Sequence, residues 1–287
     1  MKLSRKLIPA LAMLLVSAVM MTTASFAWFS INIESEVKGM TVKTTATDSV
    51  LVADSTLDAT ALATDFATDL EDSMEATLHP VSTVNGTTFF YVEKTDVDAD
   101  GKIKDDKTYA AYTDGAFSEY NAEPFCDYVF QVKASNAGSA EKYVRISALD
   151  LIYNGEGTDT QKAFRVAVFA EKRTGDAFTA TKGDLMTILK PSGAMNNSGA
   201  DKAVADVADV GTISDVLQKN AGATLGTVGA GKTEYFKVVV RIWLEGEDTT
   251  CTNDVFVGLD EESGWSLALT VKLDAEATGV TNIGSGS

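Results

Sequence analysis

Three aspartates, Asp96, Asp98 and Asp100, alternate along the sequence DVDADGKI in the pattern that begins an EF-hand calcium loop. Alternating carboxylates can converge on one Ca²⁺ ion, and Gly101 permits the sharp turn that such a loop needs. The twelfth position of the pattern is Lys107 where a bidentate glutamate belongs, and strand-like sequences flank the loop in place of helices. The sequence therefore leaves two alternatives, a calcium site with half of its ligand set and a plain acidic hairpin tip.

A second motif matches the phosphate-binding pattern G-x-x-x-x-G-K-[ST] at every specified position, which here are Gly226, Gly231, Lys232 and Thr233. Phosphate binding requires a buried strand before the loop and a helix after it, so that backbone N–H groups and the helix dipole meet the phosphates. A polar stretch rich in glycine and alanine precedes this loop, and residues 234–244 have the alternation of a strand. We expect a glycine loop that leads into a strand, with no nucleotide or other cofactor bound there.

Catalytic motifs find little support in the sequence. His79 is the only histidine, and it precedes Pro80 in a segment typical of a turn. Neither the H-E-x-x-H pattern of zinc hydrolases nor a nucleophile-elbow sequence is present. We therefore name no catalytic residue and expect a protein without enzymatic activity.

The first 27 residues have the order of a secretory signal peptide. A basic start in residues 1–6 leads to the uncharged apolar run 7–21, and Ser25-Phe26-Ala27 is a small-x-small cleavage signal. We expect cleavage between Ala27 and Trp28, which leaves a secreted protein without a membrane contact. The alternative is a retained anchor, since residues 7–29 could just reach the roughly 20 residues needed to span a bilayer.

The charge and the cysteines agree with export. The formal net charge is −17, and loss of the three basic residues in the signal segment makes it −20. Such acidity argues against nucleic acid or an anionic membrane as partner, because both repel it. The two cysteines, Cys126 and Cys251, are either one disulfide or two buried thiols. We favour the disulfide, although spacing alone does not show that the two Cα atoms approach each other.

Most apolar segments alternate with a period of two, which predicts half-buried strands. In YFKVVVRIWL, for example, Lys237 and Arg241 alternate with Val238 and Ile242, which predicts a half-buried strand. Gly39 indicates a bulge within its strand, and Asn-Gly pairs at residues 85–86 and 154–155 indicate turns. The expected strands are Val37–Thr45, Thr87–Val92, Tyr128–Lys133, Tyr143–Tyr153, Ala163–Glu171, Tyr235–Leu244 and Trp265–Leu273.

Two helices are expected. The apolar stripe of Thr56–Asp72 predicts the first, and Ser214–Lys219 is expected to form a second, short one. No proline-rich linker divides the mature chain, so residues 28–277 are expected to form one domain with a loose tail at 278–287. The fold class that follows is all-β, a jelly-roll-like β-sandwich with short helical insertions.

The segment TASFAWFS at residues 23–30, followed by INIESEVKGMTVKTTA, resembles the SipW-type signal region of Gram-positive bacteria. Together with the segments TTFFY and RIWLEGEDTTC, it makes the chain similar to the secreted TasA/camelysin-like superfamily, in particular its uncharacterised clostridial branch. The resemblance implies a jelly-roll sandwich. For the best-understood type it also implies secreted subunits that assemble into biofilm-matrix fibres.

In that assembly the N-terminal strand of one subunit completes the sheet of the next, a form of β-augmentation. Here the donor strand would be residues 28–45, in which Trp28, Phe29, Ile31 and Ile33 offer apolar anchors. The alternative is a strand that folds into the sandwich of its own subunit, and the sequence does not choose between the two. Camelysin-like members have also been classed as metallopeptidases, but this chain lacks the ligands that such an activity needs.

The expected function is that of a secreted, non-enzymatic structural protein of the extracellular matrix or cell surface. Its partners would be further copies of itself and other matrix or surface proteins. The first alternative is an adhesin that binds a carbohydrate or a protein, with Ca²⁺ at Asp96, Asp98 and Asp100 as a possible aid. A secreted hydrolase is the third hypothesis.

Overall fold

The computed structural model describes residues 37–44, 50–72, 78–83, 85–96, 109–112, 123–153, 163–190, 224–246, 248, 251 and 265–274. Over these ranges the chain forms twelve strands and one short 3-10 helix, which confirms the all-β class. None of the helical structure in these ranges is long and apolar enough to cross a membrane. The elements are β1 (Val37–Thr44), β2 (Val50–Asp54), β3 (Asp69–Asp72), β4 (Phe90–Val92), η1 (Lys94–Asp96), β5 (Tyr109–Ala111), β6 (Cys126–Ser135), β7 (Lys142–Tyr153), β8 (Phe164–Lys172), β9 (Asp184–Leu189), β10 (Thr224–Val228), β11 (Thr233–Leu244) and β12 (Trp265–Asp274).

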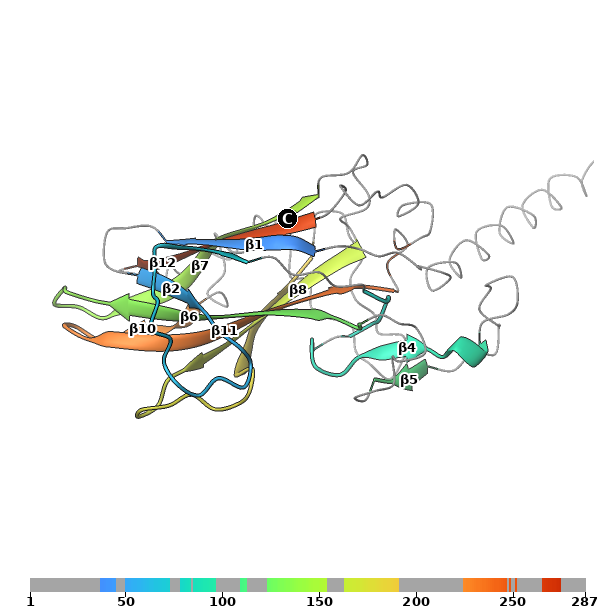
Figure 1. Cartoon of the computed structure of the whole chain (residues 1–287), viewed down its shortest axis with the longest axis horizontal. Coiled ribbons are helices and arrows are strands. Elements are labelled where there is room, and N and C mark those ends of the chain that lie inside the picture. The colour runs from blue at the N-terminus through green and yellow to red at the C-terminus, as the bar shows by residue number, and fades with distance from the viewer. Residues whose placement is uncertain are drawn as a thin grey trace, which may run out of the picture.

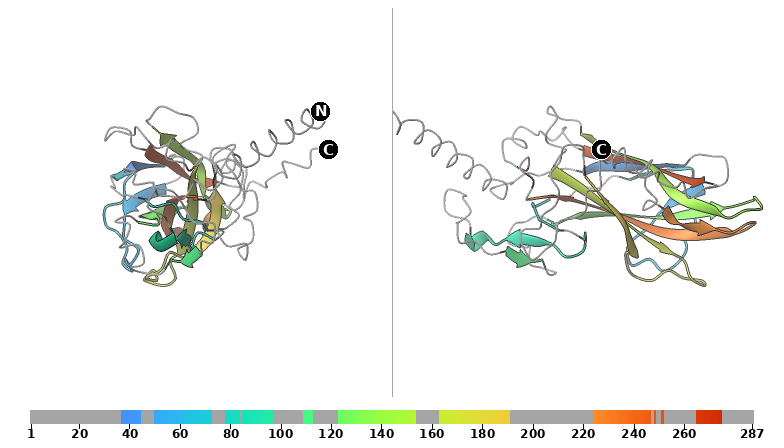
Figure 2. Two further views of the ribbon diagram at one scale, coloured as in Figure 1. Left: turned by 90° about the vertical axis from the view of Figure 1, so that its right-hand side faces the viewer. Right: turned by 180° about the vertical axis from the view of Figure 1, so that it is seen from behind.

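Ten of these strands form two sheets of five. The first sheet has the order β10-β7-β12-β1-β3 and the second has the order β2-β6-β11-β8-β9, while β4 and β5 form a separate two-stranded ribbon. Figure 1 shows the sheets as two layers, with the β4–β5 ribbon beyond one end. The end-on and rear views in Figure 2 show the same two layers. A jelly-roll path for the connections stays a prediction.

Side chains from both sheets meet in one hydrophobic core. Met40 and Val42 of β1 belong to it together with Phe236 and Val238 of β11, and all four are at most 2% exposed. At Gly226 of β10 a Cβ atom would lie 2.5 Å from the Phe236 ring, so the first sheet packs directly on this side of β11. Burial of these apolar side chains away from water is the main force that holds the two layers together.

One side of the molecule is closed by backbone hydrogen bonds between the two sheets. Val52 of β2 and Ala67 exchange both of their backbone hydrogen bonds, each at 2.8 Å, and the chain then runs on into β3. β3 pairs with β1 of the first sheet, and the Thr44 N–H donates to the Thr68 carbonyl at 3.0 Å. Residues 67–72 therefore link the edge of one sheet to the edge of the other.

The helix expected over Thr56–Asp72 is wrong, because this segment runs over the second sheet as turns and ends in β3. Its backbone groups are satisfied by the sheet, for example where the Ala63 N–H donates to Gln131 Oε1 at 2.9 Å. Threonine and aspartate recur through the segment and are poor helix formers, so tertiary hydrogen bonds outweigh the apolar stripe. The other expected helix, Ser214–Lys219, lies outside the described residues.

The long strands match their predictions within a few residues, as β7, β11 and β12 show. The pairing of β1 with β12 shifts register between Val37 and Gly39, which confirms the expected bulge. At the Asn85-Gly86 turn, Gly86 has φ of 64°, a left-handed conformation that favours glycine. The second Asn-Gly turn lies outside the described residues.

Candidate functional site

The acidic loop is described only at its start. Asp96 ends the short helix η1, and its N–H donates to the Glu93 carbonyl at 2.9 Å. Asp98 and Asp100 lie outside the described residues, so the two alternatives, a calcium site and a plain acidic hairpin tip, both stay open. In the part of the chain that is described, no group of three or more His, Cys, Asp or Glu side chains is placed to hold a metal ion.

The glycine loop joins two strands that belong to different sheets. Gly226 lies in β10, Gly231 has φ of 64° in the turn, and Thr233 begins β11 rather than a helix. The Lys232 carbonyl accepts a hydrogen bond from the Asn136 N–H at 2.9 Å, which ties this turn to the end of β6. The strand after the loop is therefore confirmed, and the glycines serve close packing and the turn.

The two cysteines are both buried thiols in the structure, so the favoured disulfide is not formed in it. Cys126 lies opposite Ile242 on the ladder between β6 and β11, and residues directly opposite share one face of a sheet. Cys251 lies beside Asp248 and Glu245 and near Arg165. Arg165 is opposite Trp243 on the ladder between β8 and β11, so Arg165 lies on the face of the sheet opposite to that of Ile242. Burial, and then the charge of Asp248, raises the pKa of the Cys251 thiol well above its usual value.

His79 is buried, with only 7% of its surface exposed. Burial lowers the pKa of its imidazole from 6.5 to about 4. Its backbone N–H donates to the Glu123 carbonyl at 2.9 Å, which joins the segment before β4 to the segment before β6. The residue thus lies within the packed structure rather than on an exposed turn.

The expected donor strand is described in its second half only. Residue 27 and the anchors Trp28, Phe29, Ile31 and Ile33 lie outside the described residues. Val37–Thr44 forms β1, an interior strand of the first sheet that runs parallel to β12 and antiparallel to β3. In this structure β1 therefore completes the sheet of its own chain.

The sequence does not predict the polar groups on the outer face of the second sheet, the face that points away from the first sheet. Three rows of side chains cross this face, each centred on β11, and we name them the lysine row, the middle row and the arginine row. The expectation that β11 is half-buried is wrong, because Lys237, Val239 and Arg241 are all at most 6% exposed. The rows are, in that order, Gln131–Lys237–Glu171, Val129–Val239–Phe169 and Asp127–Arg241–Ala167.

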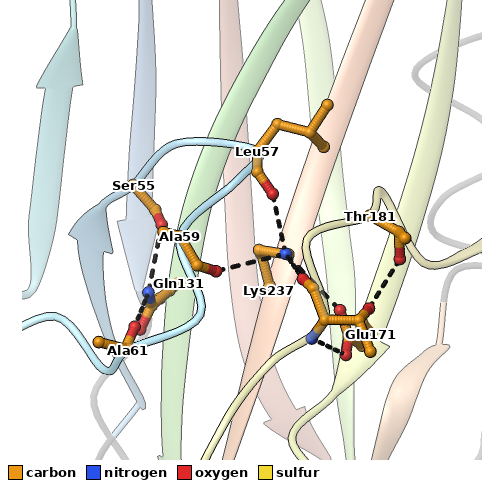
Figure 3. A network of polar contacts seen from close by, with 9 residues as sticks. Ser55, Leu57, Ala59, Ala61, Gln131, Glu171, Thr181 and Lys237 are labelled. Atoms are coloured by element: carbon orange, nitrogen blue, oxygen red, sulfur yellow. Dashed lines mark hydrogen bonds and ion pairs between the residues drawn. The ribbon is translucent and has the colours of Figure 1, made fainter.

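The lysine row is covered by two surface segments, residues 55–63 and 174–181, which we call the first and second straps. Figure 3 shows the Lys237 side chain between them. Its Nζ atom donates to the carbonyls of Leu57 at 3.1 Å, Ala59 at 3.5 Å and Thr179, and it lies 3.6 Å from a Glu171 carboxylate oxygen. The side chain is fully buried and its donors are directed at these oxygens, so Lys237 ties both straps to the sheet.

The flanking members of the lysine row hold the same two straps. Gln131 donates to the Ser55 hydroxyl at 3.1 Å and to the Ala61 carbonyl at 2.9 Å (Figure 3). Glu171 accepts a hydrogen bond from the Thr179 N–H at 2.6 Å. Amide, ammonium and carboxylate groups on three neighbouring strands thus bind the backbone of the straps.

The arginine row holds a second buried cation. Arg241 donates to both carboxylate oxygens of Asp127, at 2.7 and 2.6 Å, in the bidentate geometry that favours arginine. Its guanidinium lies 3.6 Å from the centre of the Phe125 ring and donates to the Gly86 carbonyl at 3.0 Å. Its charge is therefore balanced by a carboxylate and an aromatic face.

A third buried ion pair lies at the end of β11. Arg165 Nη2 is 2.7 Å from Asp248 Oδ2, and both side chains are 1% exposed. Beside it the Trp243 indole donates to Glu245 Oε2 at 3.3 Å, and Glu245 is also fully buried. These three buried cations of the second sheet are each bound to groups of the protein itself.

Comparison of the chain with protein-family models, with curated proteins and with solved structures returned no match.

Proposed function

We propose that this protein is a secreted, non-enzymatic structural component of the extracellular matrix or cell surface, and that its subunits form fibres by exchange of the N-terminal strand. The observation that carries the proposal is the position of β1. This strand enters from the N-terminal side of the chain, yet it lies between β12 and β3 in the interior of the first sheet.

The slot that β1 fills is suited to exchange. The strand places Met40 and Val42 in the core, while Lys43 is exposed and Thr41 is half-buried. A neighbour's β1 can make the same ladder bonds and fill the same two core positions, so exchange conserves the contacts of the closed subunit. Passing each strand to the next subunit is a head-to-tail arrangement, which grows into an open filament when the rotation does not close.

The pairing partner of β1 also favours late insertion. β1 pairs along its length with β12, the last strand described, so more than 200 residues of sequence separate the two partners. Pairing between such distant segments is slow, because the chain must first close a long loop. The β12 side of the slot is open to the strand of a neighbour until that loop has closed.

Electron microscopy of the chain from residue 28 onward tests the proposal, with ordered fibres as the expected result. Deletion of residues 28–36 removes the apolar anchors Trp28, Phe29, Ile31 and Ile33 and leaves β1 to complete its own sheet, so it is expected to abolish the fibres and leave a folded monomer. The matched control deletes nine residues at the other end, 279–287, and is expected to keep them. Failure of the intact mature chain to polymerise under any condition, or fibres from the chain without residues 28–36, would refute the proposal.

Complementation in trans tests the slot itself. A chain that starts at residue 46 is expected to bind a synthetic peptide of residues 28–45 and to gain thermal stability from it. The same peptide with Met40→Asp and Val42→Asp is the control, because carboxylates at those two positions would enter the core. Equal binding of both peptides would show that the slot does not recognise the strand.

A further inference from the structure

The two straps on the second sheet are held mainly by polar groups. Every residue of the first strap is at least partly exposed, and Leu57 is 37% exposed. The second strap has one buried residue, Phe178 at 3%. Because the straps bury so little apolar surface, their hydrogen bonds decide whether they stay in place.

Those hydrogen bonds converge on one ammonium group. Lys237 bonds Leu57 and Ala59 of the first strap and Thr179 of the second, so one side chain holds both (Figure 3). The straps also contact each other, since the Phe178 N–H donates to the Thr60 carbonyl at 2.9 Å. Loss of the ammonium would therefore loosen the two straps together.

Both straps border the apolar middle row. The first strap begins at Ser55, whose N–H donates to the Val129 carbonyl at 3.2 Å. The second strap leads into Lys182, whose ammonium lies 5.4 Å from the centre of the Phe169 ring. Val239, at the centre of the row, is fully buried. Movement of the straps would bring water to this row.

We propose that Lys237 is a latch. Its ammonium keeps both straps closed over the outer face of the second sheet, and its release opens them together and exposes the middle row while the two sheets stay folded. Glu171 positions the latch, because its carboxylate faces the ammonium and also binds the Thr179 N–H. The latch does not depend on fibre formation, so it stands or falls separately from the proposed function.

Lys237→Ala removes the ammonium and three methylene groups, a gap that n-propylammonium matches. Hydrogen exchange followed by mass spectrometry is expected to show the amides of both straps exchanging about ten- to a hundredfold faster in this variant, the effect of losing one charge-assisted hydrogen bond. Added n-propylammonium is expected to restore protection, and n-propanol, which lacks the charge, is not. Lys172→Ala is the control, because that lysine is 41% exposed and does not contact the straps in any described interaction.

The unaltered protein supplies a second measurement that does not rely on a variant folding. The Ala63, Phe178 and Thr179 amides, which lie on the two straps, are expected to exchange at one common rate, faster than the amides of β11. Exchange of these three amides only at the rate of β11 would overturn the latch, because the straps would then open only when the sheets unfold. Equal rescue of Lys237→Ala by propanol and propylammonium would also overturn it, since packing rather than charge would hold the straps.

Discussion

The buried ion pair between Arg165 and Asp248 offers the sharpest test of how charges are held inside this fold. Arg165→Met removes the cation but keeps most of the side-chain volume, and it leaves the Asp248 carboxylate in a site that is 1% exposed. Breaking a buried pair in this way costs about 3–5 kcal/mol of unfolding free energy. The midpoint of thermal unfolding is then expected to fall by roughly 6–20 °C for a domain of this size.

An exposed pair in the same sheet provides the comparison. Lys172 and Glu234 lie 3.3 Å apart, with side chains that are 41% and 29% exposed. Water screens this pair, so Lys172→Met is expected to cost only about 0–1 kcal/mol. The two ion pairs differ in burial more than in contact distance. The difference between the two losses of unfolding free energy therefore measures how much burial strengthens the effect of breaking a pair.

Urea unfolding of the single and double variants is the assay, with linear extrapolation to water. The double variant Arg165→Met/Asp248→Leu is expected to be more stable than either single variant, because neither member of the pair is left buried without the other. A cost below about 1 kcal/mol for Arg165→Met would refute the reasoning. So would a double variant that is no more stable than the worse single one.

Three further predictions concern His79, the glycine loop and calcium. Burial lowers the pKa of the folded-state His79 imidazole to about 4, whereas in the unfolded chain the imidazole takes up a proton near pH 6.5. The free energy of unfolding is therefore expected to fall by about 3 kcal/mol between pH 6.5 and pH 4. His79→Gln should remove that part of the pH dependence, and a dependence of stability on pH that is unchanged in this variant would contradict the prediction. Gly226→Ala places a Cβ 2.5 Å from the Phe236 ring and is expected to lower the free energy of unfolding by about 1–3 kcal/mol, as measured by urea unfolding. The additional loss caused by Gly226→Ala is expected to be smaller in a Phe236→Leu background. Added calcium is expected to leave the thermal midpoint unchanged, and a rise that Asp98→Asn abolishes would instead establish the acidic loop as a site.

The long strands were predictable because their apolar residues recur with a period of two over eight residues or more, as in β7 and β12. The shorter strands β2, β9 and β10 carry too few residues for a period to be counted, and they were not predicted. The segment at Thr56–Asp72 shows the opposite failure, since its helical period is clear but its backbone groups bond to Gln131, Lys237 and Val52. Those partners come from distant parts of the chain, which a local pattern does not contain.

The buried cations were missed for a related reason. Alternation along β11 assigns Lys237 and Arg241 to solvent, because a charged residue among apolar ones normally marks the exposed face. A signal was present, however, in the run VVVRIWL, where apolar residues occupy both faces of the strand and only Arg241 interrupts them. A strand that is apolar on both faces is typical of a sheet covered on both sides.

Covering the second face creates a requirement that two of the buried cations, Lys237 and Arg241, meet. A loop laid over a sheet brings backbone carbonyls out of water, and buried carbonyls need donors. An apolar side chain offers none, whereas an ammonium offers three and a guanidinium five. The straps find such donors in Lys237, and the Gly86 turn finds one in Arg241. The loops are thereby held by a few charged groups on an otherwise apolar face, an arrangement in which a loop can open without melting the sheet beneath it.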